Sequence, residues 1–157
     1  MVTEVEKPIE DPLFQTLQFS EESRWLEYVG ATKNEIPWGK GKLTYKNGAK
    51  YDGNFENGTR HDFGKMIYAE DDQYLRDYYV GQFIKDVREG TGKMRWKSGE
   101  TYEGEWRDGN RNGFGRNRQE TGTTNIVGIN KTRWQCLSSE DKLKMVTQRI
   151  YSLQKID

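Results

Sequence analysis

One stretch decides the fold: Tyr102-Glu-Gly104-Glu-Trp106-Arg-Asp-Gly109-Asn-Arg-Asn-Gly113-Phe-Gly115, whose pattern recurs along the chain. In rows of 23 residues, an aromatic stands at the first and fifth positions and glycine at the third, eighth, twelfth and fourteenth. An aromatic at the eighteenth position and a glycine at the twenty-first complete the row. Of the 17 glycines, 16 obey this rule, in rows that begin at Tyr28, Tyr51, Tyr79 and Tyr102.

Alternation with a period of two predicts that each row is a β-hairpin. In the third row, Gly92, Met94 and Trp96 share one face of a strand, while Lys93 and Arg95 point to the other. Glycines beside the aromatics leave room for rings to lie over the backbone. The expected fold is mainly β, an elongated single-layer antiparallel sheet of about four hairpins with one aromatic and one polar face.

The rows resemble the MORN (membrane occupation and recognition nexus) repeat over residues 28–122. That family includes ciliary radial-spoke proteins, cytoskeletal and membrane-junction scaffolds, and accessory modules on enzymes. The resemblance implies an elongated sheet whose aromatic groove holds proteins, with lipid binding implied less strongly.

Some residues break the repeat pattern. Five extra residues between the second and third rows form, most simply, a longer turn, although Tyr74 and Tyr78 there also suggest a contact loop. Other departures place non-glycine or non-aromatic residues at pattern positions: Thr32, Glu35, Asp62, Asp71, Asp86, Asn117 and Gln119.

The aromatic face is the expected partner-binding groove, because no second sheet is predicted to cover it. In the alternative interpretation, the rings stack on one another and only fill the curvature of the sheet. The groove residues are Tyr51, Phe55, Tyr68, Tyr79, Phe83, Trp96, Tyr102 and Trp106.

The flanks differ from the rows. Residues 1–27 read as an extended acidic arm, and residues 1–30 carry a net charge of −5 against +5 for residues 107–157. Residues 123–157 read as a linker and an amphipathic helix over about 139–154, which either caps the sheet or docks on a partner. The apolar face of that helix is formed by Leu143, Val146, Ile150 and Leu153.

Composition excludes several classes of protein. Hydrophobic residues make up only 32% of the chain, which predicts a thin core. No apolar run approaches the ~20 residues of a membrane-spanning helix, and the N-terminal residues do not resemble a signal or transit peptide. Cys136 has no partner for a disulfide. We therefore expect a cytoplasmic protein, with the cilium or cytoskeleton as the setting favoured by the resemblance.

The sequence offers little for catalysis. His61 and Asp62 are neighbours in the expected turn of the second row, where successive side chains diverge, and no second histidine is available. No glycine pair continues into a phosphate-binding loop. We expect no catalytic residue, cofactor, metal site, small-molecule substrate or nucleic acid. One basic cluster could hold an anionic lipid headgroup: Arg107, Arg111, Arg116 and Arg118.

The predicted function is a non-catalytic scaffold for protein–protein interaction, built as a structural subunit into a larger assembly. A peripheral membrane tether that binds anionic lipid is the alternative. An accessory subunit of an enzyme complex is the second alternative.

Overall fold

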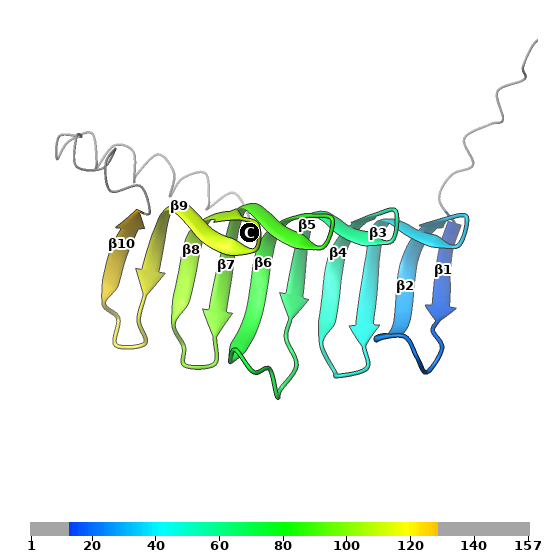
Figure 1. Cartoon of the computed structure of the whole chain (residues 1–157), viewed down its shortest axis with the longest axis horizontal. Helices are drawn as coiled ribbons and strands as arrows, with labels where there is room; N and C mark the ends of the chain where they lie inside the picture. The colour runs from blue at the N-terminus through cyan, green and yellow to red at the C-terminus, as the bar shows by residue number, and fades with distance from the viewer. Residues whose placement is uncertain (1–12, 129–157) are drawn as a thin grey trace, which may run out of the picture.

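The computed structural model describes residues 13–128, which form one open antiparallel sheet with its ten strands in chain order (Figure 1). The strands are β1 Leu13–Gln18, β2 Trp25–Lys33, β3 Ile36–Tyr45, β4 Lys50–Glu56, β5 Thr59–Ile67, β6 Arg76–Ile84, β7 Val87–Trp96, β8 Thr101–Arg107, β9 Asn110–Arg118 and β10 Thr124–Gly128. The four predicted hairpins are confirmed as β2–β3, β4–β5, β6–β7 and β8–β9.

The sheet is longer at both ends than the sequence predicted. At the N-terminal end, β1 lies within the residues predicted as the arm and pairs with β2. At the C-terminal end, β10 lies after residue 122, where the predicted sheet ended, and pairs with β9. Leu17 and Val127 pack against the core, which explains why these two edge strands are part of the sheet. Residues 1–12 and the predicted C-terminal helix lie outside the described residues. Within residues 13–128 there is no helix that is long and apolar enough to cross a bilayer.

The seventh and eighth residues of each row form the turn of its hairpin, and both have positive φ. This conformation belongs to the two-residue turns that match the twist of antiparallel strands. Glu35 and Asp86, which stand where glycine was expected, adopt φ of 60° and 70°. The turns are Asn34–Glu35, Asn57–Gly58, Lys85–Asp86 and Asp108–Gly109.

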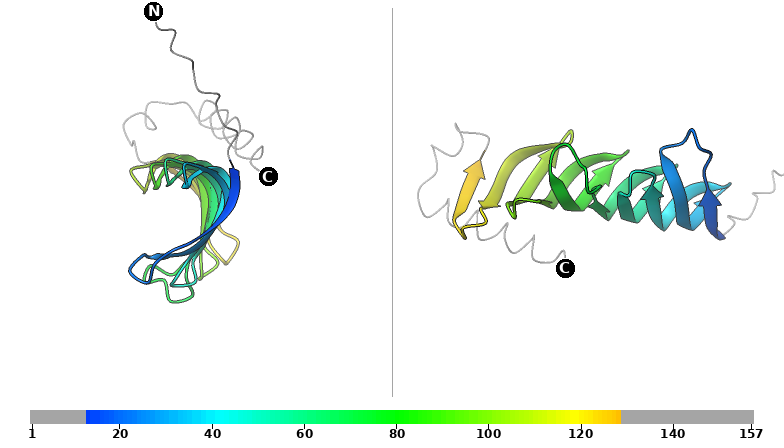
Figure 2. Two further views of the ribbon diagram at one scale, coloured as in Figure 1. Left: turned by 90° about the vertical axis from the view of Figure 1, so that its right-hand side faces the viewer. Right: turned by 90° about the horizontal axis from the view of Figure 1, so that it is seen from below.

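A bulge bends every hairpin at the same place. The register of β6 with β7 shifts between Gly81 and Phe83, and the other three hairpins shift at the equivalent position. Opposite each bulge, the twelfth residue has positive φ, as in Gly90 (66°) and in Asp62 (56°), which replaces glycine there. Because bulges bend a strand and increase its twist, the sheet curves into a C in cross-section (Figure 2).

The first tyrosine of each row lies flat across two glycines on neighbouring strands. A Cβ added to Gly92 would lie 2.2 Å from Tyr79 Oη, and one added to Gly81 would lie 2.5 Å from the same atom. The Tyr79 hydroxyl donates to the carbonyl of Gln82 at 3.2 Å. Tyr28, Tyr51 and Tyr102 repeat this arrangement.

The fifth-position ring joins one row to the next. Phe83 meets both Tyr79 of its own row and Tyr51 of the preceding row edge to face, with centroids 5.1 and 5.4 Å apart. Such contacts continue from Tyr28 to Tyr102 through Phe55 and Trp106. This continuous file of rings is the core of the protein.

Candidate functional site: an arginine-lined concave groove

The predicted aromatic groove is corrected by the structure, because most of its rings are core. Six of the eight expose at most 5% of their surface: Tyr51, Phe55, Tyr79, Phe83, Tyr102 and Trp106. Only Tyr68 and Trp96 are half-buried at the edge of this file. The alternative interpretation, in which the rings stack on one another, is the observed one. The curvature of the sheet brings the rings together, so a flat open strip does not form.

Three arginines cover the file of rings; the sequence analysis did not predict Arg60 and Arg88 as site residues and predicted Arg111 only as part of a lipid patch. Arg60 in β5, Arg88 in β7 and Arg111 in β9 all occupy the tenth position of their rows, and the first row has Pro37 there. The signal was present in the alignment of the rows, as a cation at one position in three of four. This tenth position lies outside the glycine and aromatic pattern that predicts the hairpins.

Each of these guanidinium groups lies over two rings. The Arg88 Cζ atom is 4.8 Å from the Trp106 centroid and 5.8 Å from that of Tyr79. Arg60 lies in the same way over Phe83 and Tyr51, and Arg111 over Trp96 and Tyr102. Stacking on a ring is a favourable use of the planar guanidinium and restricts its orientation.

The turn of the next row determines how each arginine is paired. The amide of Asp86 donates to the carbonyl of Arg60 at 2.9 Å, and the amide of Gly109 donates to that of Arg88 at 3.1 Å. At the first of these contacts, the Asp86 carboxylate accepts from Arg60 Nε at 2.8 Å. Asp86 therefore neutralises Arg60 because an acid stands at a position where the pattern has glycine.

Arg88 has no such acid, because the equivalent residue is Gly109. Its Nη2 atom donates to the Gly109 carbonyl at 2.6 Å and its Nη1 atom to the Tyr68 hydroxyl at 2.9 Å. Arg111 belongs to the last row, and among residues 13–128 it forms no ion pair with a carboxylate. Among residues 13–128, therefore, no carboxylate forms an ion pair with two of these three arginines, Arg88 and Arg111.

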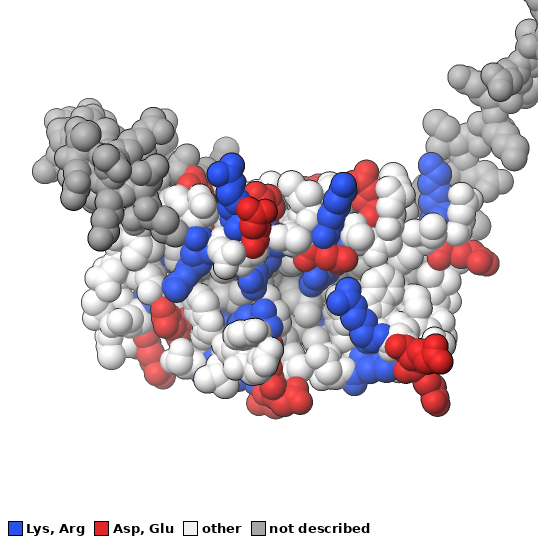
Figure 3. All heavy atoms as spheres, in the orientation of Figure 1, with Lys and Arg blue, Asp and Glu red and all other residues white. Residues whose placement is uncertain are grey.

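A hollow of about 600 Å³ lies on the concave face, with basic side chains along it (Figure 3). Five basic and two acidic side chains line it, for a net charge of +3. The whole chain, in contrast, has a net charge of zero. The lining residues with charge are Arg24, Lys46, Arg60, Arg76, Arg88, Asp72 and Asp86.

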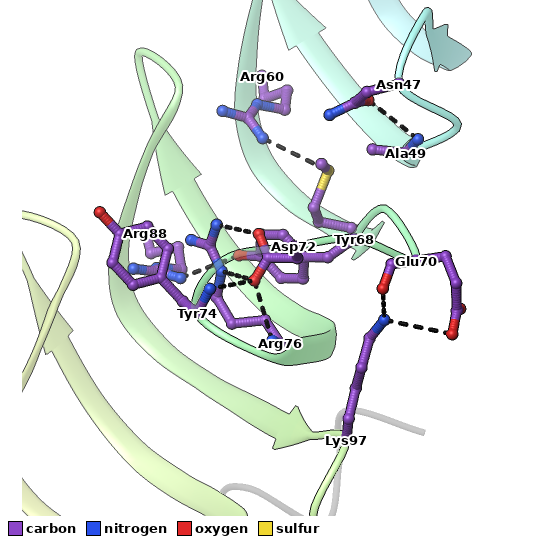
Figure 4. Close-up of polar contacts among 11 residues, drawn as sticks. Asn47, Ala49, Arg60, Tyr68, Glu70, Asp72, Tyr74, Arg76, Arg88 and Lys97 are labelled. Atoms are coloured by element: carbon purple, nitrogen blue, oxygen red, sulfur yellow. Dashed lines mark hydrogen bonds and ion pairs between the residues drawn. The ribbon is translucent and has the colours of Figure 1, made fainter.

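The inserted loop forms part of the rim and is tightly bonded (Figure 4). Asp72 accepts from Arg76 through both carboxylate oxygens, at 3.0 and 2.6 Å, and this hydrogen bonding lowers the pKa of Asp72. The Arg76 guanidinium lies between Tyr68 and Tyr74, 4.1 and 4.8 Å from their centroids. Tyr74 stays largely exposed at the tip, so the loop could contact a partner without rearrangement.

Tyr78, predicted to share this loop, belongs to β6 instead. It alternates with the buried Tyr79 and therefore points to the opposite, convex face, where Lys65 lies 5.4 Å from its centroid. The two tyrosines of the predicted contact loop are separated by the sheet.

The predicted lipid patch is also divided by the sheet. Arg111 lies on the concave face over Trp96. Arg116 lies on the convex face, because it alternates with Gly115, over which Tyr102 packs, and it forms an ion pair with Glu103 at 2.6 Å. Residues on two faces of one sheet do not make a single headgroup site.

Burial of the tyrosine hydroxyls predicts an alkaline limit of stability. Desolvation raises the pKa of Tyr28 and Tyr102 to about 12, from an ordinary value of 10.0, and raises that of Tyr51 and Tyr79 as well. The folded state thus favours the neutral phenol. This stabilisation is complete below pH ~10 and is lost as the pH rises towards 12.

We therefore expect tyrosinate absorbance and loss of the β-sheet circular dichroism signal to appear together in an alkaline titration. Full ionisation of all tyrosines near pH ~10 with the sheet signal intact would contradict the buried arrangement.

Comparisons with known proteins agree with the repeat pattern. The family model described as MORN repeat matches residues 28–50, 51–73, 79–101 and 102–116, more than half of the chain. Alsin from Homo sapiens and from Mus musculus is 32% identical over 88 residues, which are 56% of this chain and 5% of Alsin. ALS2 C-terminal-like protein from Homo sapiens is 31% identical over 88 residues, 9% of its length. The chain spans less than a tenth of the length of these relatives.

Proposed function

Since this chain belongs to the MORN repeat family, we propose that it is a non-catalytic scaffold that binds a protein partner in its concave groove as a structural subunit of a larger assembly. MORN repeats suggest a protein-interaction or membrane-association module. The single observation that supports the protein partner is the hollow on the concave face, which is recessed between two rims of turns.

The groove has the features of a preformed binding site. Its floor is held by the stacked rings, and its arginines are oriented by those rings and by backbone carbonyls. Tyr68 and Val87 contribute apolar surface beside the charges. A rigid concave site of mixed apolar and polar character needs little ordering on binding, which favours affinity.

The lining of the hollow also supports a non-catalytic role. It contains arginine, lysine, asparagine, tyrosine, carboxylate and apolar groups, and none of its residues is serine, threonine, cysteine or histidine. Both of its carboxylates are engaged by Arg60 and Arg76. The ciliary or cytoskeletal setting and the role as an accessory subunit of an enzyme stay predictions from the family resemblance.

A pair of photo-crosslinking variants tests this function. Val87 lines the hollow and Ile67 lies on the convex face, with side chains 42% and 41% exposed. With p-benzoylphenylalanine at either position in the full chain, we expect protein adducts from native extract at position 87 and few at position 67. Equal labelling at both positions, or labelling only at position 67, would show that the groove is not the interface.

A further inference from the structure

The geometry points to the chemistry of the partner: we propose that the groove takes an acidic protein segment whose carboxylates recur at intervals of about 10 Å. This proposal rests on the proposed function, in which the groove binds a protein. The partner is a chain other than this one, and its acidic side chains pair with Arg88 and Arg111.

Charge is the first argument. The hollow has a net charge of +3, and its two acids already pair with Arg60 and Arg76. Among residues 13–128, the guanidinium groups of Arg24, Arg88 and Arg111 form no ion pair with a carboxylate. A groove that keeps uncompensated cations in a chain of zero net charge is complementary to an acidic ligand.

Orientation is the second argument. The Arg88 guanidinium lies over the Trp106 ring, and the Arg111 guanidinium lies over the Trp96 ring. The planar guanidinium matches a carboxylate with two parallel hydrogen bonds. Arg88 lines the hollow, and Arg111 occupies the same repeat position one row further along the concave face. The rings thus reduce the side-chain freedom that each arginine would lose on binding.

Spacing is the third argument. Arg88 and Arg111 stand at one repeat position on β7 and β9, two strands apart. Neighbouring strands are about 4.8 Å apart, so the two side chains are offset by about 10 Å along the sheet. Seven residues of an α-helix rise about 10.5 Å and return to nearly the same face. A helical segment with acids seven residues apart therefore matches the arginines.

The shape of the sheet favours a protein segment over a bilayer. The hollow and its basic lining residues lie on the concave face, which Figure 3 shows with Lys and Arg side chains along it, and turns rise on both sides of that face (Figure 2). A narrow acidic segment can enter this groove, whereas the surface of a bilayer is too broad to reach its floor.

Fluorescence anisotropy with the full chain tests the proposal. The probe is a labelled helical peptide with Glu at every seventh position, and its twin has Gln at those positions. We expect the Glu peptide to bind about tenfold more tightly than the twin, because charge-assisted pairs replace neutral ones. We also expect its affinity to fall as salt is added.

Variants identify the site. Arg111→Gln should weaken binding of the Glu peptide several-fold, and Arg111→Lys should restore part of it because the charge returns. The matched control is Arg95→Gln, which also removes one positive charge. Arg95 is half-exposed on the convex face and forms an ion pair with Asp77 at 3.4 Å. Arg111 forms no hydrogen bond that a change to Gln would break among residues 13–128, so the fold should persist, as circular dichroism will check.

Three outcomes would overturn the proposal: equal binding of the two peptides, equal effects of Arg111→Gln and Arg95→Gln, or binding to phosphatidylserine vesicles that depends on Arg111 while the peptide fails to bind. The last outcome would assign the groove to lipid. If crosslinked adducts form at position 87 but the Glu peptide does not bind, the proposal of an acidic partner is wrong. The proposed function, in which the groove binds a protein, would still stand.

Discussion

Gly81→Val is expected to lower the melting temperature by about 10 °C or more, the largest effect on stability that we predict. A Cβ at Gly81 would lie 2.5 Å from the Gly92 Cα atom, 2.5 Å from Tyr79 Oη and 2.6 Å from the Thr91 carbonyl. Two of these contacts are with backbone, so no side-chain rotation relieves them. Tyr79 would have to leave the core, and the file of rings would be broken in its centre.

Thermal unfolding followed by circular dichroism measures this effect. The control is Gly48→Asn, at a turn glycine with φ of 85° and no atom within 4 Å of an added Cβ, where Asn tolerates the conformation. Gly104→Val repeats the clash in the last row, 2.5 Å from the Gly115 Cα atom, and should cost several degrees. A melting temperature for Gly81→Val equal to that of the control would mean that Tyr79 does not lie across this glycine.

Phe83→Ala should cost about 3–5 kcal/mol of unfolding free energy, the second large effect. The Phe83 side chain is 2% exposed and joins the rings of Tyr51 and Tyr79, so its removal leaves a cavity between two rows. Trp96→Ala should cost less, because Trp96 is half-buried at the edge of the file and retains solvent contact.

Urea denaturation of both variants compares their unfolding free energies. Capture of the partner is a second measurement, made on whichever variant stays folded. We expect Trp96→Ala to remain folded and to weaken binding through the loss of the surface beneath Arg111. If Phe83→Ala were as stable as the unmodified protein, the burial of this ring would be wrong.

The repeat pattern predicted the hairpins and their faces because it is local. Tyr79, Gly81 and Phe83 share a face by alternation alone, and the structure confirms this. Whether that face is open depends on curvature, which arises from the bulge at Gly81 and the positive φ of Gly90 in the facing strand. The sequence marks such a glycine but not the angle through which the sheet bends, so the pattern predicts an open groove where the structure has buried rings.

The arginines illustrate a different difficulty. Their periodicity is visible in the sequence, but their pairing depends on a residue of the next row. In the sequence pattern Asp86 is only a departure from glycine, whereas in the structure it neutralises Arg60. Likewise, the acidic, proline-containing N-terminal segment is typical of an arm, whereas the pairing of β1 with β2 and the packing of Leu17 show that residues 13–18 belong to the sheet.

The chain-order arrangement of the strands has a mechanical consequence. Because every strand pairs only with its neighbours in sequence, the two ends of the described chain lie at opposite edges of the sheet (Figure 1). The hydrogen bonds of an antiparallel ladder run perpendicular to the strands and hence along the length of this sheet. Tension applied between the two edges therefore opens the ladder one strand at a time, beginning at β1 or β10, so the protein yields gradually under load and the central rows that hold Arg88 are among the last to open.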